Sequence, residues 1–332
     1  MAEMLYLSSG EVADLADMPD YVAAVRDAYR QFGDGGRLGA EVKLFRDSPD
    51  GMLMYYGAIL PASGVMGTFL YAGGFGADGA WFLTALCDAE TGAPLALVDS
   101  PGINPYKTGA TGGVGTDALA RPDAAELALV GTGPQAAYQL LAVDGVRELT
   151  DVRAYSPTPA SREAFARRMD DRFDADVRAV GSAGAALRGA DVVVTATSSH
   201  DPVIDAADIE PGTHITAMGQ SHPDRRELDA ETVANSLYVP DLRERALDAS
   251  GELRGAIAAG AVDESHVHAD LGAVLAGNAP GRTDPDQVTV FDMGGTGVET
   301  LAATAMVVEH ARERDRGTAL AVTPRSEGFD PV

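Results

Sequence analysis

Basic side chains are scarce in this sequence of 332 residues. It contains 25 lysine and arginine residues against 50 aspartate and glutamate residues, a formal net charge of −25 at pH 7. Contacts to nucleic-acid phosphates need a basic face, so this balance argues against a nucleic-acid partner. The acidic residues are spread through periodic apolar sequence, which argues against disorder. Concentrated salt screens the repulsion between the many negative side chains, so this acidity suits a protein from a halophilic source. The alternative is an ordinary acidic cytosolic protein.

Cysteine and long apolar runs are also lacking. Cys87 is the only cysteine, so an internal disulfide is excluded, which fits a reducing compartment. No apolar run is long enough for a transmembrane helix, and the first residues do not have the pattern of a signal peptide. We therefore expect a cytoplasmic protein with no membrane partner.

Apolar periodicity divides the chain into two regions. Residues 17–33 have the pattern of an amphipathic helix, and residues 41–98 contain short apolar runs that predict an antiparallel or mixed sheet. The segment 107–120 is predicted to be helical despite its glycines. Beyond it, strands alternate with helices, which predicts a doubly wound parallel sheet. The strands expected there are 126–130, 151–155, 177–180, 191–195, 214–218, 236–240 and 287–291.

These patterns predict an α/β protein with two domains. A Rossmann-type domain is expected at residues 119–299, and an α+β domain at residues 1–118 together with 300–332. The helix predicted at 300–314 would return the chain to the first domain, and the tail 317–332 has no strong periodicity.

A G-x-G-x-x-A motif lies between the first strand and first helix of the second region. This context is typical of a dinucleotide site, in which the pyrophosphate binds at the helix N-terminus. Gly131 would permit the tight turn, Gly133 would let the backbone approach the pyrophosphate, and Ala136 would allow close helix–strand packing. The predicted binding segment comprises Gly131, Thr132, Gly133, Pro134, Gln135 and Ala136.

The residues that follow the second strand expected in the Rossmann-type domain, 151–155, indicate which dinucleotide is preferred. NAD-binding proteins usually have an acidic residue there, whereas this chain has Ser156 and Thr158, followed by Arg162. Hydroxyls and an arginine suit a 2′-phosphate, so NAD(P) is predicted with NADP favoured, unless Arg162 is simply a solvated helix residue. Further residues predicted to contact the cofactor at later strand ends are Thr197, Ser198, Ser199, Gly219, Gly295 and Gly297.

The whole chain resembles the ornithine cyclodeaminase/mu-crystallin family, which includes archaeal alanine dehydrogenases and ketimine reductases. The resemblance implies a Rossmann domain inserted in a substrate-binding and dimerisation domain, and a homodimer. The segments that support it are 89–99, 107–110, 119–124, 131–136 and 226–229.

The resemblance also implies the substrate residues. The chain has only two lysines, Lys43 and Lys107, and both fall where the family has arginines that bind the substrate carboxylate. Lysine keeps the charge but loses the bidentate geometry of arginine. Tyr56 and Phe69 are expected to narrow the substrate pocket, which favours a small or apolar side chain.

Two positions depart from the family pattern. Phe69 replaces a usual lysine, and Ser221 replaces an aspartate that is assigned to proton transfer in cyclodeaminases. His222 is a candidate acid–base group or an exposed loop histidine, and Asp224 is another possible substitute. These departures argue against ornithine cyclisation.

We therefore predict an NAD(P)-dependent oxidoreductase acting on the C–N bond of a small amino or imino acid, either an imine or ketimine reductase or an alanine-dehydrogenase-like enzyme. Ornithine cyclodeaminase and a weakly catalytic, mu-crystallin-like NADP-binding protein are the alternatives. His266 and His268 lie near acidic residues, but no third ligand motif accompanies them, so no metal is expected.

Overall fold

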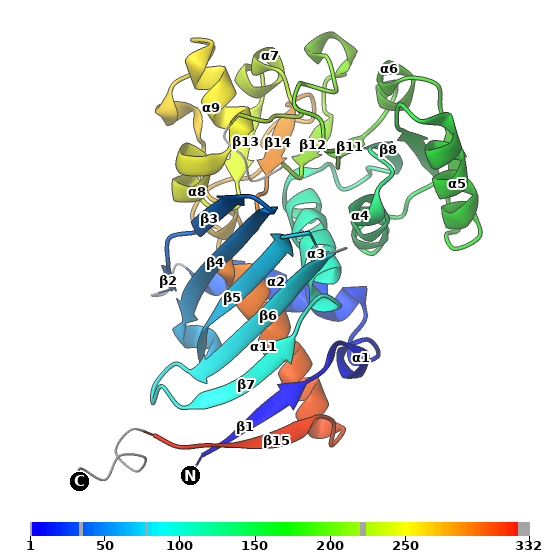
Figure 1. The fold of residues 1–332 in the computed structure, drawn as a ribbon. Coiled ribbons are helices and arrows are strands. Elements are labelled where there is room, and N and C mark those ends of the chain that lie inside the picture. The colour runs from blue at the N-terminus through cyan, green and yellow to red at the C-terminus, as the bar shows by residue number, and fades with distance from the viewer. Residues whose placement is uncertain (1, 33–35, 77–78, 220–223, 325–332) are drawn as a thin grey trace. The chain divides into compact units, whose positions relative to one another are not determined.

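The computed structural model describes residues 2–32, 36–76, 79–219 and 224–324. The chain forms two compact units, Met1–Lys107 with Thr296–Val332, and Thr108–Gly295. The divisions therefore fall at 107/108 and 295/296, where the sequence suggested 118/119 and 299/300. The second unit contains a parallel sheet flanked by helices, as the predicted α/β fold class requires (Figure 1).

The first unit contains an eight-stranded sheet within the described residues, in the order β15-β1-β7-β6-β5-β4-β2, with β3 also paired to β4. Neighbouring strands are antiparallel except β1 and β7. The strands are β1 (Ala2–Leu7), β2 (Arg37–Leu38), β3 (Val42–Asp47), β4 (Asp50–Leu60), β5 (Val65–Gly74), β6 (Ala80–Asp88), β7 (Pro94–Asp99) and β15 (Thr318–Val322).

Strand β15 was not predicted, because its side chains are mostly exposed and show no apolar alternation. Its backbone pairs with β1 in antiparallel register, from Ala2 opposite Val322 to Tyr6 opposite Thr318. This pairing between the two ends of the chain depends on backbone hydrogen bonds, which side-chain patterns do not reveal.

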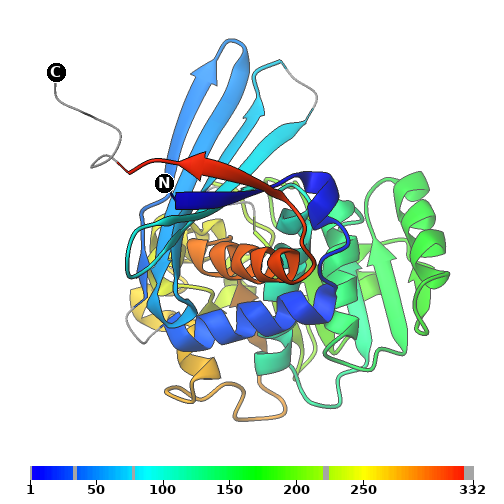
Figure 2. The ribbon, with the colours of Figure 1, turned by 90° about the horizontal axis from the view of Figure 1, so that it is seen from below.

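Helices α2 (Met18–Phe32) and α11 (Gly297–Glu313) pack against each other, and α11 contacts β4, β5 and β6 (Figure 2). The face of α2 predicted to be apolar is buried at Val22, Val25, Ala28 and Tyr29, whereas Phe32, predicted on the same face, is half-buried. The predicted C-terminal helix corresponds to α11 and belongs to the first unit. The short helix α1 (Ser9–Val12) follows β1.

Register defines a second, open face of this sheet, which we call the outer face. Leu44, Tyr55, Ile59, Trp81 and Leu83 are exposed, and Trp81 reaches 71%. Leu70 on β5 pairs with Tyr55 on β4 and with Leu83 on β6, and Ala72 on β5 pairs with Trp81 on β6. Tyr55, Leu83 and Trp81 therefore share one face of the sheet. A contiguous exposed apolar surface of this kind is typical of an interaction site.

The second unit is a seven-stranded parallel sheet, in the order β10-β9-β8-β11-β12-β14-β13. Two apolar clusters pack on the sheet and its helices, one around Leu127 and Val152 and the other around Ala128 and Val193. The strands are β8 (Glu126–Val130), β9 (Asp151–Tyr155), β10 (Asp176–Ala179), β11 (Val192–Thr195), β12 (His214–Ala217), β13 (Leu237–Pro240) and β14 (Thr289–Asp292). The helices are α4 (Pro134–Asp144), α5 (Pro159–Asp170), α6 (Ala183–Leu187), α7 (Ala230–Ala234), α8 (Arg243–Ala249), α9 (Gly251–Ala258) and α10 (Leu271–Leu275).

Helix α3 (Ile103–Leu119) shows why the division falls earlier than expected. From Gly109 onward it packs tightly on α4: a Cβ atom at Gly109 would lie 2.5 Å from the carbonyl oxygen of Tyr138, and one at Gly113 would lie 2.9 Å from the Cβ atom of Ala142. The glycines therefore assign residues 108–119 to the second unit through packing.

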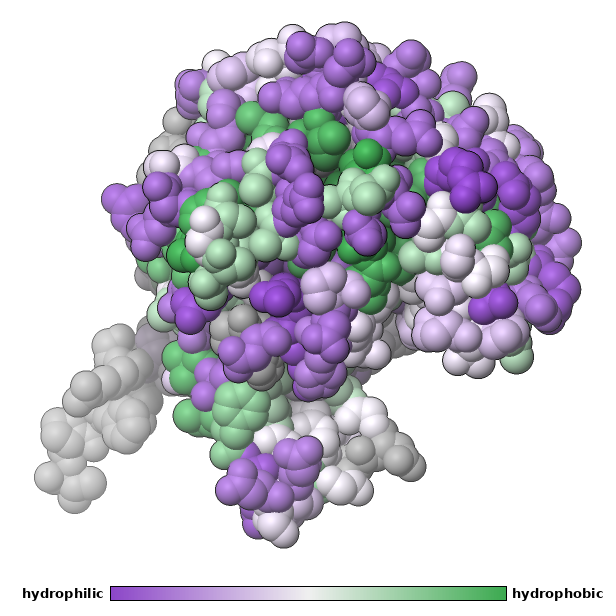
Figure 3. Space-filling model, turned by 90° about the horizontal axis from the view of Figure 1, so that it is seen from above, coloured by the Kyte–Doolittle hydropathy of each residue, from purple (hydrophilic) through white to green (hydrophobic). Residues whose placement is uncertain are grey.

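On the face drawn in Figure 3, hydrophilic side chains are spread across the surface and smaller hydrophobic patches lie between them. Within the described residues, no helix is both long enough and apolar enough to span a membrane.

Candidate cofactor site and candidate substrate residues

A glycine turn joins strand β8 to helix α4. Gly131 has a φ of +112°, and a Cβ atom there would lie only 2.1 Å from the carbonyl oxygen of Ala196, just beyond β11. The Gly131 N–H donates to the carbonyl of Tyr155 at 2.8 Å. Glycine is required at this position because both the backbone angle and the space exclude a side chain.

Gly133 is the N-cap of α4 and has a different environment. Its φ of −75° suits any residue, but a Cβ atom there would meet no heavy atom within 4 Å, so the backbone faces open space. No side chain caps this helix terminus. Unpaired N–H groups and the helix dipole favour an anion at such a terminus, which fits a pyrophosphate. Ala136 is fully buried, as its predicted packing role requires.

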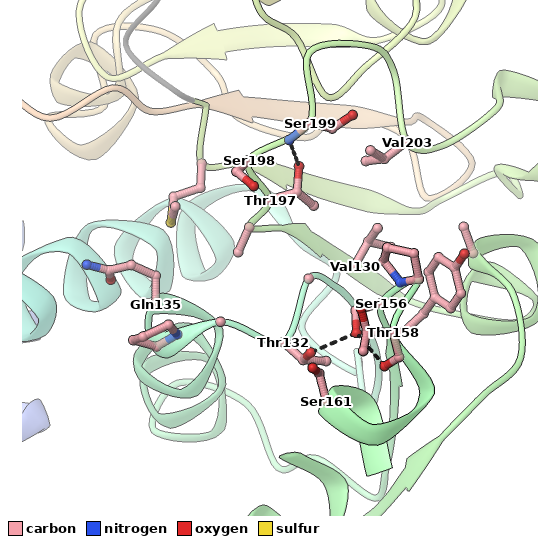
Figure 4. A pocket seen from close by; sticks show the side chains of 18 residues that line it. Val130, Thr132, Gln135, Ser156, Thr158, Ser161, Thr197, Ser198, Ser199 and Val203 are labelled. Atoms are coloured by element: carbon pink, nitrogen blue, oxygen red, sulfur yellow. Dashed lines mark hydrogen bonds between the residues drawn. The ribbon is translucent and has the colours of Figure 1, made fainter. Parts of the chain in front are cut away.

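A cavity of about 820 Å³ opens beside this turn (Figure 4). It lies at the carboxyl ends of β8, β9 and β11, where ligands bind in open parallel sheets. Its volume is within the range of about 300–1,000 Å³ found for small-molecule and cofactor sites. The lining residues are Val130, Gly131, Thr132, Gly133, Pro134, Gln135, Tyr155, Ser156, Pro157, Thr158, Ser161, Ala183, Ala196, Thr197, Ser198, Ser199, Val203 and Met218.

Hydroxyl groups line the β9 end of the cavity. The hydroxyl of Thr132 donates to that of Ser156 at 2.9 Å, and Thr158 is the N-cap of α5 (Figure 4). Arg162 donates to the backbone carbonyl of Ser156 at 2.9 Å, and its guanidinium carbon lies 5.9 Å from the centre of the Tyr155 ring. The arginine is thus held at the backbone of Ser156 without being one of the residues that line the cavity, and none of the described lining residues is acidic.

The opposite end of the cavity is formed by the segment after β11. Thr197, Ser198 and Ser199, which the sequence suggested as cofactor contacts, line it, and Gly219, with a φ of +66°, directly follows the lining residue Met218. Glu227 lies in one of the family segments but was not predicted to have a role. The structure places this buried carboxylate behind the same end of the cavity.

The two glycines predicted after β14 have different environments. Gly295 has a φ of +85° and ends the second unit, whereas Gly297 begins α11 in the first unit. A Cβ atom at Gly297 would lie 2.9 Å from both the Cβ atom of Ala58 and the carbonyl oxygen of Gly57. Close packing against β4 therefore explains the glycine at 297, and neither glycine lines the cavity.

Lys107 is the last residue of the first unit and is almost completely buried. Its ammonium nitrogen lies 3.3 Å from Oε1 of Glu299, and their side chains are only 5% and 1% exposed. Burial alone would lower the pKa of Lys107, but Tyr56 and Glu299 beside it raise that pKa above its ordinary value. Lys107 is therefore a buried positive charge whose neighbours include the Glu299 carboxylate and Tyr56.

Glu299 was not singled out from the sequence. It accepts hydrogen bonds from the backbone and the hydroxyl of Thr296 in a capping box at the start of α11. It also accepts one from the hydroxyl of Tyr29 at 2.8 Å. Its spacing from Thr296 was a recognisable capping signal, but its pairing with Lys107 joins positions 192 residues apart.

Tyr56 and Phe69 lie together on the helix-covered side of the sheet. Their rings stack with centroids 4.9 Å apart, and Phe69 also contacts Phe82. The hydroxyl of Tyr56 lies 3.1 Å from that of Thr300, and burial raises the pKa of Tyr56. Phe69 is only 2% exposed, so the usual family lysine is replaced by a core aromatic residue.

Lys43 lies on β3 opposite Met54, the neighbourhood expected from the resemblance. Its ammonium group is 2.9 Å from a carboxylate oxygen of Glu41. Ser221 and His222 lie outside the described residues, and Asp224 is exposed.

His266 and His268 each use Nε2 to contact a backbone carbonyl, of Val233 at 2.8 Å and Pro280 at 2.9 Å. In the described part of the chain, no three histidine, cysteine, aspartate or glutamate residues form a group that could hold a metal ion.

Relatives of known description share this architecture. The family model of the ornithine cyclodeaminase/mu-crystallin family matches residues 3–315. An alanine dehydrogenase of Archaeoglobus fulgidus is 31% identical over 320 residues, which cover 95% of this chain and 98% of the relative.

Two solved structures are similar over nearly the whole chain. The Δ1-pyrroline-2-carboxylate reductase of Thermococcus litoralis, in complex with NADH and L-proline, has a TM-score of 0.90, 31% identity, and coverage of 95% of this chain and 99% of its own. The iminosuccinate reductase of Paracoccus denitrificans, in complex with NAD⁺, has a TM-score of 0.90, 28% identity, and coverage of 97% and 100%. Both the α/β fold class and the resemblance expected from the sequence are confirmed, and the chain belongs to the ornithine cyclodeaminase/mu-crystallin family.

Proposed function

We propose that this protein is an NAD(P)-dependent oxidoreductase that acts on the C–N bond of a small amino or imino acid. The observation that carries the proposal is the cavity at the carboxyl ends of β8, β9 and β11, with a glycine turn and an uncapped helix N-terminus at its edge. The residues present fit a dinucleotide, because Gly133 leaves room for the pyrophosphate. The named relatives, two reductases and a dehydrogenase, support the same class of reaction.

The substrate carboxylate is assigned to Lys107, with Lys43 as a second cation. A buried ammonium group gives a strong charge-assisted contact, about 1.5–3 kcal/mol for such hydrogen bonds. When bound, a nicotinamide cofactor would supply the hydride chemistry. The protein orients the carbon atom of the substrate C–N bond and excludes water, so its contribution is mainly positioning.

Reduction of an imine is favoured over cyclisation of ornithine. Phe69 is buried in an aromatic stack and has no group that could move a proton, and Ser221 replaces the usual aspartate. Reducing a preformed imine depends less on such groups than deamination does. Ornithine cyclodeamination and cofactor binding with little catalysis are therefore the lesser alternatives.

NADP is the favoured cofactor. The β9 end of the cavity presents the hydroxyls of Ser156 and Thr158, with Arg162 held nearby, and the described lining residues include no acid to bind a ribose 2′-hydroxyl. A 2′-phosphate would find a cation and hydroxyl donors there.

We further propose that the outer face of the first unit joins two copies of the chain in a homodimer. The exposed Tyr55, Trp81 and Leu83 offer an apolar surface of the kind found at the core of such interfaces. One relative of similar fold, an archaeal alanine dehydrogenase with bound NAD, is described as a dimer. The single cysteine, which cannot form an internal disulfide, favours a cytoplasmic location.

The decisive experiment follows nicotinamide absorbance with the purified protein in molar KCl. NADPH and NADH are each offered with small 2-oxo acids plus ammonia or methylamine, and with cyclic ketimines. We expect steady consumption of the cofactor with at least one substrate of these classes. Cofactor binding without consumption would favour the weakly catalytic alternative, whereas release of ammonia and proline from ornithine would establish the cyclodeaminase.

A further inference from the structure

Glu227 is a carboxylate with no exposed surface, and it contacts three segments near the cavity. Its Oε1 accepts from the backbone N–H of Thr197 at 2.6 Å. Its Oε2 accepts from the hydroxyl of Thr195 at 2.9 Å and from the backbone N–H of Gly219 at 3.1 Å. One side chain thus joins the end of β11, the segment after β11 and Gly219, the second residue beyond β12.

The backbone of Glu227 is fixed from the other side by the carboxyl group of a second glutamate. Glu252, at the start of α9, accepts from the N–H groups of Glu227 and Leu228 at 2.8 and 2.9 Å. The Glu227 carbonyl in turn accepts from the N–H of Val203, which lines the cavity. Glu227 is therefore immobilised at both its backbone and its side chain, as a residue that orients others must be.

The geometry points to Glu227 as the positioning residue for the nicotinamide half of the cofactor site. This inference rests on the proposed function. Strand order reverses between β8 and β11, so a dinucleotide extends across this point, with its adenosine half toward β9 and its nicotinamide half toward β11 and β12. Every side-chain contact of Glu227 described above lies on the β11–β12 side, and the adenosine side is formed by other residues, such as Ser156 and Thr158.

The replacement Glu227→Gln tests this assignment. The carboxylate accepts from donors at both oxygens, whereas an amide has one oxygen and one NH₂ group, so its NH₂ must face a backbone N–H of either Thr197 or Gly219. Thr195→Val is a milder variant that removes only the hydroxyl bond. Glu231→Gln is the matched control, because Glu231 is an exposed acid four positions along the same segment.

Two ligand sets separate positioning from folding: complete NADPH and NADH, and their adenosine fragments 2′,5′-ADP and ADP-ribose. We expect Glu227→Gln to bind the fragments as the unaltered protein does, and to lower kcat with the dinucleotide by about 10- to 100-fold, the scale of a misplacement of about 1 Å. Thr195→Val should show a smaller loss in the same direction, and Glu231→Gln none.

Equal weakening of fragment and dinucleotide binding would mean that Glu227 is only structural, and unchanged kcat with the dinucleotide would also overturn the inference. If Glu227→Gln does not fold, Thr195→Val decides by the same comparison. If the unaltered protein binds the fragments and the dinucleotides, and both Glu227→Gln and Thr195→Val have the same kcat as the unaltered protein, the proposed function stands and the inference fails. If the unaltered protein binds no dinucleotide, both fail.

Discussion

The ammonium group of Lys107 lies 3.3 Å from the carboxylate of Glu299, and both side chains are almost completely shielded from solvent. Glu299 caps α11 and accepts a hydrogen bond from Tyr29, so the cation proposed to bind substrate is also part of the core of the first unit. A substrate carboxylate would share Lys107 with Glu299. Variants of either residue must therefore separate stability from substrate binding.

Lys107→Met leaves the Glu299 carboxylate buried without its cation. We expect the free energy of unfolding to fall by about 3–5 kcal/mol, the usual cost of removing one partner of a buried pair. The double variant Lys107→Met/Glu299→Gln should recover much of this stability but not the affinity for substrate. Denaturant unfolding and the KM for the imino acid check the two effects, and full recovery of KM in the double variant would remove Lys107 from substrate binding.

Gly131→Ala and Gly133→Ala should have different consequences although they lie two residues apart. A methyl group at 131 meets the Ala196 carbonyl in a strained backbone region, so both stability and NAD(P)H affinity should fall. A methyl group at 133 meets only open space, so the melting temperature should stay within about 2 °C while cofactor affinity falls. Thermal unfolding measures the stability of the two variants, and fluorescence titration measures their affinity for NAD(P)H. Unaltered cofactor affinity in Gly133→Ala would contradict the assigned pyrophosphate position.

Arg162→Ala tests the preference for NADP. Loss of a charged contact of about 1.5–3 kcal/mol should raise the KM for NADPH about tenfold or more and leave that for NADH nearly unchanged. Arg168→Ala on the same helix is the control, because its guanidinium lies over the Phe165 ring. Equal effects of Arg162→Ala on both cofactors would argue against a 2′-phosphate contact.

Burial raises the pKa of Glu252 to about 8 in the folded protein, from an ordinary value of 4.5. The folded state therefore holds a proton that the unfolded chain releases above about pH 4.5. Its contribution to stability is complete below that pH and is lost as the pH rises through about 8. Glu252→Gln should flatten the fall in unfolding free energy between pH 5 and pH 8.5, and Glu231→Gln should not. Parallel curves for Glu252→Gln and the unaltered protein would exclude this titration.

Trp81→Glu places a charge on the outer face of the first unit. Because Trp81 is 71% exposed, the change should not disturb folding, but it should convert a homodimer into monomers. Sedimentation in molar KCl measures the state, with Trp81→Phe as the apolar control. A dimer that persists in Trp81→Glu would place the interface elsewhere.

Local patterns predicted the second unit well. The apolar runs gave strands β8 and β9 with their bounds, and the glycine turn between β8 and α4 followed from residues adjacent in sequence. Contacts between segments that are distant in sequence were harder to predict. Nothing near Thr318 indicated that its strand pairs with β1, and nothing near Lys107 indicated Glu299 as its partner. Glu227 was visible within a family segment, but its role depends on three backbone segments that only the fold brings together.

The burial of Lys107 should make its reaction with acylating reagents slow. Of the two lysines in the sequence, Lys43 is the more exposed, with 20% of its side chain accessible against 5% for Lys107, so a small acylating reagent should label Lys43 first. Acylation of Lys107 would require a local opening that separates it from Glu299. The rate at which Lys107 gains the label, read by mass spectrometry against Lys43 as an internal reference, would therefore report how often the core of the first unit opens under native conditions.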